Sequence, residues 1–218
     1  MYDDNLIPDF SGDDFANDKN IQKARAAIQA REKMIADSLD VVREKLNVIN
    51  GAHKNFKGFY MFKSLAATLK KSFRARNENT DLQISLAEYA FTILTGKLAN
   101  SGTDQYLFGY FTMKNKYPKT YIHKETIKEK IAELFLKQEV DFEHSKKFSR
   151  KFYVITEDKR RLQELLLLKN LDSLTAFPDL ELELNDNACL FRNSRKPISL
   201  EGATIFCELA IALLTVFD

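Results

Sequence analysis

The most reactive side chains that lie close together in the sequence are Asp141, Glu143 and His144. Carboxylates and imidazoles bind metal ions, and a carboxylate beside an imidazole also forms an acid–base pair. In an extended stretch, however, the two carboxylates point to one face and His144 to the other. The triplet also lacks the second half of a site. We therefore interpret these residues as surface groups, with a metal or acid–base site as the alternative.

The two cysteines are the only thiols. Cys189 and Cys207 have apolar neighbours and no adjacent cation or histidine that would lower a thiol pKa. They also belong to no CxxC or Cys/His cluster of the kind that binds zinc. We predict that both are buried structural residues.

A small basic cluster, Arg192, Arg195 and Lys196, precedes Ser199, which has the residue type of a helix N-cap. Backbone N–H groups at the start of a helix bind anions, so this cluster is a candidate anion site. A solvated loop explains the same residues, and we prefer that interpretation.

Motifs of known catalysis are missing. The sequence contains no GxSxG, Walker A, GxGxxG, HExxH or EF-hand pattern, and its seven glycines form no phosphate-binding loop. We therefore predict no catalytic, metal-binding or cofactor-binding residues and no cofactor. An enzyme without a recognisable motif is the alternative. The net charge of +2, from 33 Lys and Arg against 31 Asp and Glu, argues against a nucleic-acid partner, which would show a strong basic excess.

The N-terminal residues divide into two parts. Positions 1–18 contain six Asp and no Lys or Arg, so we predict an acidic flexible tail over 1–19. A long amphipathic helix is predicted over 20–52, because apolar residues recur every seven positions. Its apolar face either docks on the protein's own body or contacts a second copy or a protein partner. The recurring positions are Ile21, Ile28, Ile35, Val42 and Ile49.

A basic segment follows the long helix. Between Lys54 and Arg76 there are seven Lys or Arg and no acidic residue, interleaved with aromatic and aliphatic side chains. This pattern predicts a basic amphipathic segment. It is either a helix docked on the core with a basic solvated face, or a contact with an anionic membrane surface or an acidic partner. The candidate surface-binding residues are Lys63, Lys70, Lys71, Arg74 and Arg76.

Residues 53–218 predict one α+β domain. Apolar residues alternate over 82–93 and predict a strand. Near Ala87-Glu88 the apolar residues switch from even to odd positions, which indicates a bulge or a change of face. We expect this strand to form a hairpin with 105–113 around a turn over 96–104. Further helices are predicted over 124–138, 158–168 and 171–177, with a last helix beginning at Ser199. Further strands are predicted over 148–156, 180–185 and 189–192.

In the strand over 180–185, Glu181 and Glu183 alternate with leucines, so we expect them on a wet face, and Asp186-Asn187 is expected to turn the chain. The predicted fold class is therefore α+β, with antiparallel strands, helices packed on one face, and the long amphipathic helix in front.

Three motifs in the C-terminal half resemble those of a family of uncharacterised bacterial proteins, many of them membrane-anchored. The family has a DxDF-like run, then FSxxYxL, then an aspartate that opens a helix. Leu180–Leu184, Leu190–Arg192 and Ile198-Ser199 are similar to its final hairpin and last helix. The resemblance implies a soluble domain at the inner face of a membrane and transfers no catalytic residue. The matching motifs are Glu139–Phe142, Phe148–Val154 and Asp158.

Outside the expected core, the strongest features of the sequence are two surface segments, the amphipathic helix and the basic segment that follows it. We therefore predict a non-enzymatic interaction or scaffold protein that binds a protein partner or a second copy through residues 20–50. An anionic membrane surface is a further expected partner. We expect a cytoplasmic location, extending to the membrane periphery. No stretch approaches the roughly 20 apolar residues of a membrane-spanning helix, and the N-terminus lacks the parts of a signal peptide.

Overall fold

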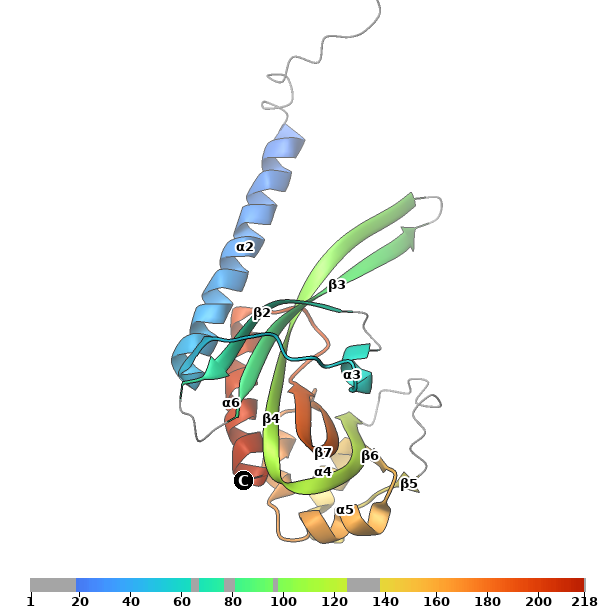
Figure 1. The fold of residues 1–218 in the computed structure, drawn as a ribbon. Coiled ribbons are helices and arrows are strands. Elements are labelled where there is room, and N and C mark those ends of the chain that lie inside the picture. The colour runs from blue at the N-terminus through green and yellow to red at the C-terminus, as the bar shows by residue number, and fades with distance from the viewer. Residues whose placement is uncertain (1–18, 64–66, 77–80, 96–97, 125–137, 218) are drawn as a thin grey trace, which may run out of the picture.

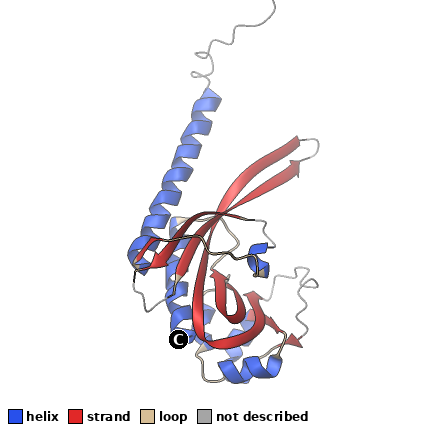
Figure 2. Cartoon of the chain, viewed as in Figure 1, coloured by secondary structure: helices blue, strands red, loops and turns tan. Residues whose placement is uncertain are grey.

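The computed structural model describes residues 19–63, 67–76, 81–95, 98–124 and 138–217, which form one antiparallel sheet with helices around it (Figures 1 and 2). This confirms the predicted α+β class with a long N-terminal helix. The strands are β1 (Val48–Asn50), β2 (Thr68–Ala75), β3 (Gln83–Thr95), β4 (Leu98–Lys124), β5 (Gln138–Glu139), β6 (Phe152–Thr156) and β7 (Glu181–Arg192). The helices are α2 (Lys19–Leu46), α3 (Tyr60–Lys63), α4 (Lys146–Lys151), α5 (Lys159–Leu166) and α6 (Leu200–Phe217), with short 3-10 helices η2 (Glu143–Ser145) and η3 (Leu171–Ala176).

Strand β4, 27 residues long, organises the sheet. Gly109 pairs with both β3 and β7, and Ile122 pairs with both β6 and β7, so β7 lies on the edge of β4 opposite to β3 and β6. The register with β7 shifts between Thr112 and Tyr117 and again before Thr120. Figure 1 shows that β4 curls in its C-terminal half, so that the sheet wraps around one of its own faces.

The first and larger core lies between the sheet, α6 and the C-terminal half of α2. The Phe191 ring lies 6.0 Å from the Phe111 ring and stacks on Phe206 at 5.3 Å. Gly109 makes this packing possible, because a Cβ atom there would lie 2.0 Å from the Phe191 ring. The position therefore requires glycine for space rather than for backbone freedom.

A second apolar core fills the opposite, wrapped face of the sheet. Residues 56–62, including α3, insert their side chains against β4, with the Phe56 and Tyr110 rings 5.9 Å apart and the Phe62 and Phe108 rings 5.7 Å apart. A covered second face means that some strand positions expected to face water are buried.

Helix α6 is the most apolar of the described helices. Its 18 residues have a mean hydropathy of 1.8, which by length and composition alone would suffice to cross a membrane. This differs from the expectation that no stretch approaches a membrane-spanning length. The helix packs against α2, β4 and η3. Core packing therefore accounts for its buried apolar residues, while Leu200 and Ile211 remain exposed. Its buried residues all belong to the first core and are Ala203, Phe206, Cys207, Leu209, Ala210, Leu213, Val216 and Phe217.

The basic segment is not an amphipathic helix, which corrects the helical interpretation of 54–76. Only Tyr60–Lys63 is helical, and Thr68–Ala75 forms β2, which pairs antiparallel with β3. The partner strand lies elsewhere in the sequence, and such non-local pairing overrides local periodicity. The long helix also ends earlier than predicted, at Leu46, because Asn47 adopts a left-handed φ of 46° and the next residues form β1.

The predicted hairpin of β3 and β4 is confirmed, but the expected turn over 96–104 is too long, since Thr95 already pairs with Leu98. The parity change near Ala87 is a change of face. Leu86 belongs to the first core and Ala87 to the second. The bulge lies in the neighbouring strand β2, at Leu69–Lys71.

The C-terminal half contains two corrections. Residues 181–192 form one strand rather than a hairpin, because Asp186 takes a φ of 55° and the strand continues along β4. Residues 146–151 are helical, so the next strand begins at Phe152. The predicted helix at 158 is confirmed, with the Asp158 carboxylate accepting from the N–H of Arg161 (3.0 Å). The predicted tail over 1–19 lies outside the described residues except for Lys19, which begins α2, and most of the predicted helix over 124–138 also lies outside them.

Candidate functional site

The two halves of α2 have different surroundings. In the C-terminal half, Leu39 and Val42 are 1% and 0% exposed and pack in the first core. In the N-terminal half, residues 22–33 are exposed, and the Ile28 side chain is 58% exposed. Figure 1 shows this half extending beyond the body of the protein. The long helix thus docks on its own domain with one half and presents the other half, Lys19–Lys33, to solvent.

The apolar stripe of α2 continues from the docked half onto the exposed half. At 3.6 residues per turn, Ile21, Ala24 and Ile28 lie on the same face as the buried Leu39 and Val42. Within the described residues, Ala24 and Ile28 are exposed on this continuation, whereas Ile21 is half-buried. The continuation at Ala24 and Ile28 is therefore an exposed surface of the same character as the part that packs on α6.

The exposed half of α2 is strongly basic. Over residues 19–33 the helix has five basic residues and one acidic residue, Glu32. Arg25 and Arg31 border the apolar stripe, and Lys19 and Lys23 lie further round the helix. An apolar stripe bordered by positive charge fits a ligand that carries both apolar and negatively charged groups.

Arg31 marks the boundary between the two halves. Its Nη2 donates to the carbonyl of Thr103 and to Oδ1 of Asp104 (3.0 Å), both on β4. Beyond this contact, β3 and β4 continue as a two-stranded hairpin that also extends from the body (Figure 1). The helix and the hairpin are therefore linked at their base.

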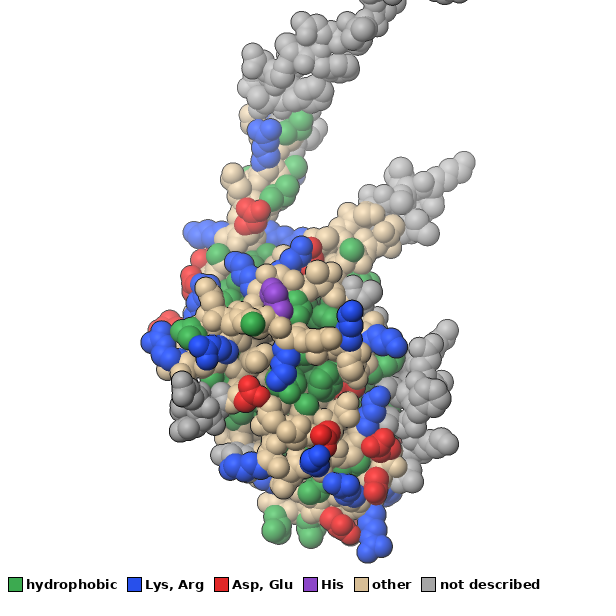
Figure 3. Space-filling model, in the orientation of Figure 1, with side chains coloured by type: hydrophobic (Ala, Val, Ile, Leu, Met, Phe, Trp, Pro, Cys, Tyr) green, Lys and Arg blue, Asp and Glu red, His purple; other side chains and the backbone are tan. Residues whose placement is uncertain are grey.

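The five residues predicted to form a basic surface do not share one face. Lys71 and Arg74 occupy opposite faces of β2, because successive strand residues alternate. Lys70 pairs with Glu88 (2.7 Å), and this hydrogen bond is the main reason why the pKa of Glu88 lies below its ordinary value. Lys63 ends α3, and Arg76 follows β2. Figure 3 shows Lys and Arg side chains spread across this side of the molecule rather than gathered in one patch.

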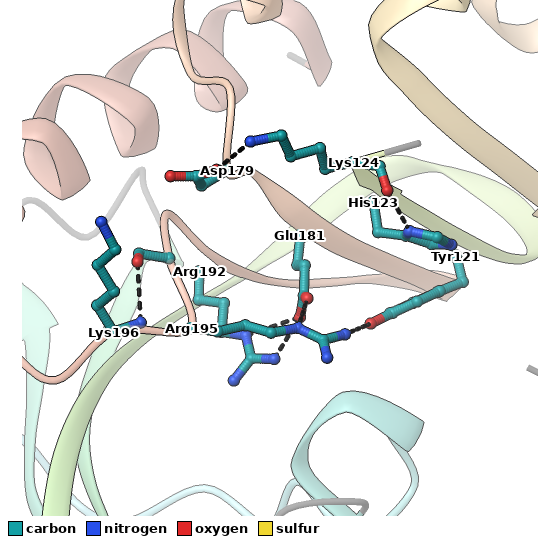
Figure 4. A network of polar contacts seen from close by, with 9 residues as sticks. Tyr121, His123, Lys124, Asp179, Glu181, Arg192, Arg195 and Lys196 are labelled. Atoms are coloured by element: carbon teal, nitrogen blue, oxygen red, sulfur yellow. Dashed lines mark hydrogen bonds and ion pairs between the residues drawn. The ribbon is translucent and has the colours of Figure 1, made fainter. Parts of the chain in front are cut away.

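A buried network of charges lies at the two ends of β7 (Figure 4). Glu181 is 0% exposed and accepts hydrogen bonds from Nε of Arg192 (2.7 Å) and Nε of Arg195. Nη2 of Arg195 also donates to the Tyr121 hydroxyl (3.5 Å). Burial, followed by the negative charge of Glu181, raises the pKa of Tyr121, so this phenol stays neutral. The arrangement is an ion-pair network with one carboxylate between two guanidinium groups, and Nη1 of Arg192 is buried without a hydrogen-bond partner among the described residues.

Glu183 holds α3 in place from the same face of β7. Its two carboxylate oxygens accept from the backbone N–H groups of Tyr60 and Met61, each at 2.9 Å. Burial raises the pKa of Glu183, and these two hydrogen bonds oppose the increase. Glu183 therefore acts as a cap on the first turn of α3 that is supplied by a distant strand.

Sequence reasoning placed Glu181 and Glu183 on a wet face, and this expectation is wrong. Both are buried, because residues 56–62 cover the second face of the sheet. The sequence signal for a buried Glu181 was the basic cluster at the end of β7. Two of its members, Arg192 and Arg195, are the ion-pair partners of Glu181 rather than an anion site.

A cavity of about 240 Å³ lies beside the first turn of α6. Its lining includes Leu107, Phe177, Asp179, Lys196 and Ile205. It is smaller than the pockets of roughly 300–1,000 Å³ that hold drug-sized ligands. The N-cap hydroxyl of Ser199 already accepts from the N–H of Gly202 (3.0 Å).

The other candidate residues have structural roles. His144 Nε2 donates to the carbonyl of Leu166 (3.1 Å) and so caps the end of α5 instead of joining Asp141. Cys189 and Cys207 are buried as free thiols, as predicted. Across the part of the chain that the structure describes, no group of three or more His, Cys, Asp or Glu could hold a metal ion.

Comparisons with known proteins return no match: no family model, no curated protein and no solved structure is similar to this chain.

Proposed function

We propose that the protein is a non-enzymatic interaction module whose docking surface is the exposed half of α2, and that its partner is an acidic amphipathic helix of another protein. The single observation that carries the proposal is the continuation of the apolar stripe past Arg31 onto an exposed, basic half-helix. We further propose a cytoplasmic location, with peripheral membrane association when the partner resides there.

Charge favours an acidic partner over a second copy. Two exposed halves of α2 packed by their apolar stripes would bring together two surfaces that each carry five basic residues and one acidic residue, Glu32. Like charges across an interface oppose association, whereas opposite charges speed it and select the partner. Glutamates that flank an apolar seam would meet Arg25 at the border of the stripe.

Direct membrane binding through the basic segment has less support. An amphipathic membrane helix needs its basic and apolar residues on opposite sides of one helix. Here the basic residues of β2 divide between two faces of a strand. Contact with an anionic membrane through Lys63, Lys70, Lys71, Arg74 and Arg76 therefore becomes an outcome for the experiment to test.

The probe is a fluorescein-labelled synthetic helix of three heptads, with Ile and Leu at the seam and Glu beside it. We expect fluorescence anisotropy to show binding to the full chain that weakens with salt. Binding should fall at least tenfold in the Lys23→Gln/Arg25→Gln variant. It should persist in Lys146→Gln/Lys147→Gln, which removes the same charge from the exposed surface of α4.

Two results would contradict the proposal. One is equal binding of the acidic probe to both double variants, or equal binding of a matched probe with Lys in place of Glu. The other is no probe binding together with co-sedimentation on vesicles containing phosphatidylserine that is lost when Lys70, Lys71, Arg74 and Arg76 are replaced by Gln. The second result would assign the function to the membrane surface.

A further inference from the structure

We infer that the acidic N-terminal segment of this chain, residues 1–18, occupies the exposed basic half of α2 when no partner is bound, so that the docking surface is masked by its own chain. This inference rests on the proposed function, because it assigns a competitor to the same surface. A partner helix would then bind only by displacing the segment.

The two segments have complementary charge. Residues 1–18 contain six Asp and no Lys or Arg, whereas Lys19–Arg31 contains four basic residues and no acid. The acidic segment also carries apolar side chains that match the uncovered stripe at Ala24 and Ile28, namely Leu6, Ile7, Phe10 and Phe15. It therefore has the same chemistry that we propose for the partner.

The segment is long enough to reach the surface. Thirteen helical residues span about 20 Å at 1.5 Å per residue. Ten extended residues span about 33 Å, so 1–18 holds enough chain to reverse direction before Lys19 and then lie along the helix. The covalent link also raises the effective concentration to the millimolar range, so individually weak contacts suffice for occupancy.

Masking has a quantitative consequence for the partner. The apparent affinity of a ligand falls by the fraction of molecules whose site is open. If the segment occupies the site nine-tenths of the time, removing its charge should increase probe affinity about tenfold. The Asp3, Asp4, Asp9, Asp13 and Asp14→Asn variant removes the charge without changing side-chain size, and it leaves Asp18 beside the helix start unchanged.

The acidic helical probe described above is titrated into the full chain and into this five-Asn variant. We expect about tenfold tighter binding to the variant, and competition by a free peptide of residues 1–18 added to it. The Asp141→Asn/Glu143→Gln variant, which removes exposed acids elsewhere, measures the general effect of a more positive protein. Its increase in affinity should be well below tenfold.

A photo-crosslinker placed at Phe10 or Phe15 of the full chain tests the position directly. We expect crosslinks within one chain to residues 19–31, reduced by the five-Asn change and by Lys23→Gln/Arg25→Gln. Equal probe affinity for the native chain and the five-Asn variant would overturn self-masking while leaving the proposed function intact. Absence of probe binding to both would overturn the proposed function itself. Crosslinks only between chains, with a native dimer by light scattering, would place the segment on a second copy and overturn the assignment within one chain.

Discussion

Arg192 and Glu181 stand at opposite ends of β7, yet Nε of Arg192 lies 2.7 Å from Oε2 of Glu181. Eleven residues of straight strand would separate them by about 36 Å. The strand therefore bends back on itself, and the left-handed Asp186 (φ 55°) lies at the bend. The bend also switches the parity of the strand, so that Leu184 before it and Cys189 after it both face the first core.

Removing Arg192 should be strongly destabilising. Arg192→Met leaves the fully buried Glu181 with only the partly exposed Arg195 as its cation. Breaking a buried ion pair by removing one partner costs about 3–5 kcal/mol. Urea unfolding should show a loss of this size. Arg195→Met, at a side chain 32% exposed, should cost less, and equal losses in the two variants would show that burial does not decide their contributions.

Glu183 should make stability depend on pH in the direction opposite to an ordinary salt-bridged carboxylate. Its pKa is raised in the folded protein, so the folded state holds a proton more tightly than the unfolded chain. Its stabilising effect is full below the ordinary value of 4.5 and is lost as the pH rises through the raised pKa. Glu183→Gln stays neutral and lacks this loss. The free energy of unfolding of the native chain should therefore fall relative to Glu183→Gln as the pH rises above 4.5. A constant difference above that pH would contradict the prediction.

Gly109→Ala and Gly58→Ala form a matched pair of substitutions, one in the core and one in open space. In Gly109→Ala the new methyl group would meet the buried Phe191 ring at 2.0 Å, while at Gly58 nothing lies within 4 Å of the new atom. Overpacking a core costs about 1–3 kcal/mol, so thermal unfolding should show that loss for Gly109→Ala. Gly58→Ala should stay within about 0.5 kcal/mol of the native chain. A stable Gly109→Ala would mean that the aromatic stack moves aside easily.

Both cysteines should be unreactive in the folded protein. Burial raises the pKa of Cys207 to about 11 and that of Cys189 well above its ordinary value. Thiolate is the reactive form, and at pH 8 only about one Cys207 thiol in a thousand would be ionised. Labelling with a thiol reagent should be very slow in buffer and complete in urea. Fast labelling of either residue without urea would show that α6 or β7 opens locally.

Several elements could be predicted from local sequence because local sequence causes them. The seven-residue recurrence from Ile21 to Val42 specifies a helix wherever the helix docks, and Asp158 and Ser199 cap helices with their own side chains. The charge of the candidate docking surface was also readable, since Lys23 and Arg25 occupy an acid-free stretch. The sequence could not show which half of the helix stays exposed, because that depends on the packing against α6 and on the contact of Arg31 with β4.

The amino-acid sequence by itself determined the helical and extended periodicities, the α+β class, the buried thiols and the acidic and basic segments. Tertiary structure alone decided that 68–75 is a strand, that Glu181 and Glu183 are buried, and that β7 bends at Asp186 instead of forming a hairpin. The physical reason is the distance along the sequence over which each interaction acts. Helix periodicity and capping act within a few residues, whereas strand pairing and the covering of a second sheet face depend on residues such as Tyr60 and Met61, more than 120 positions away from Glu183.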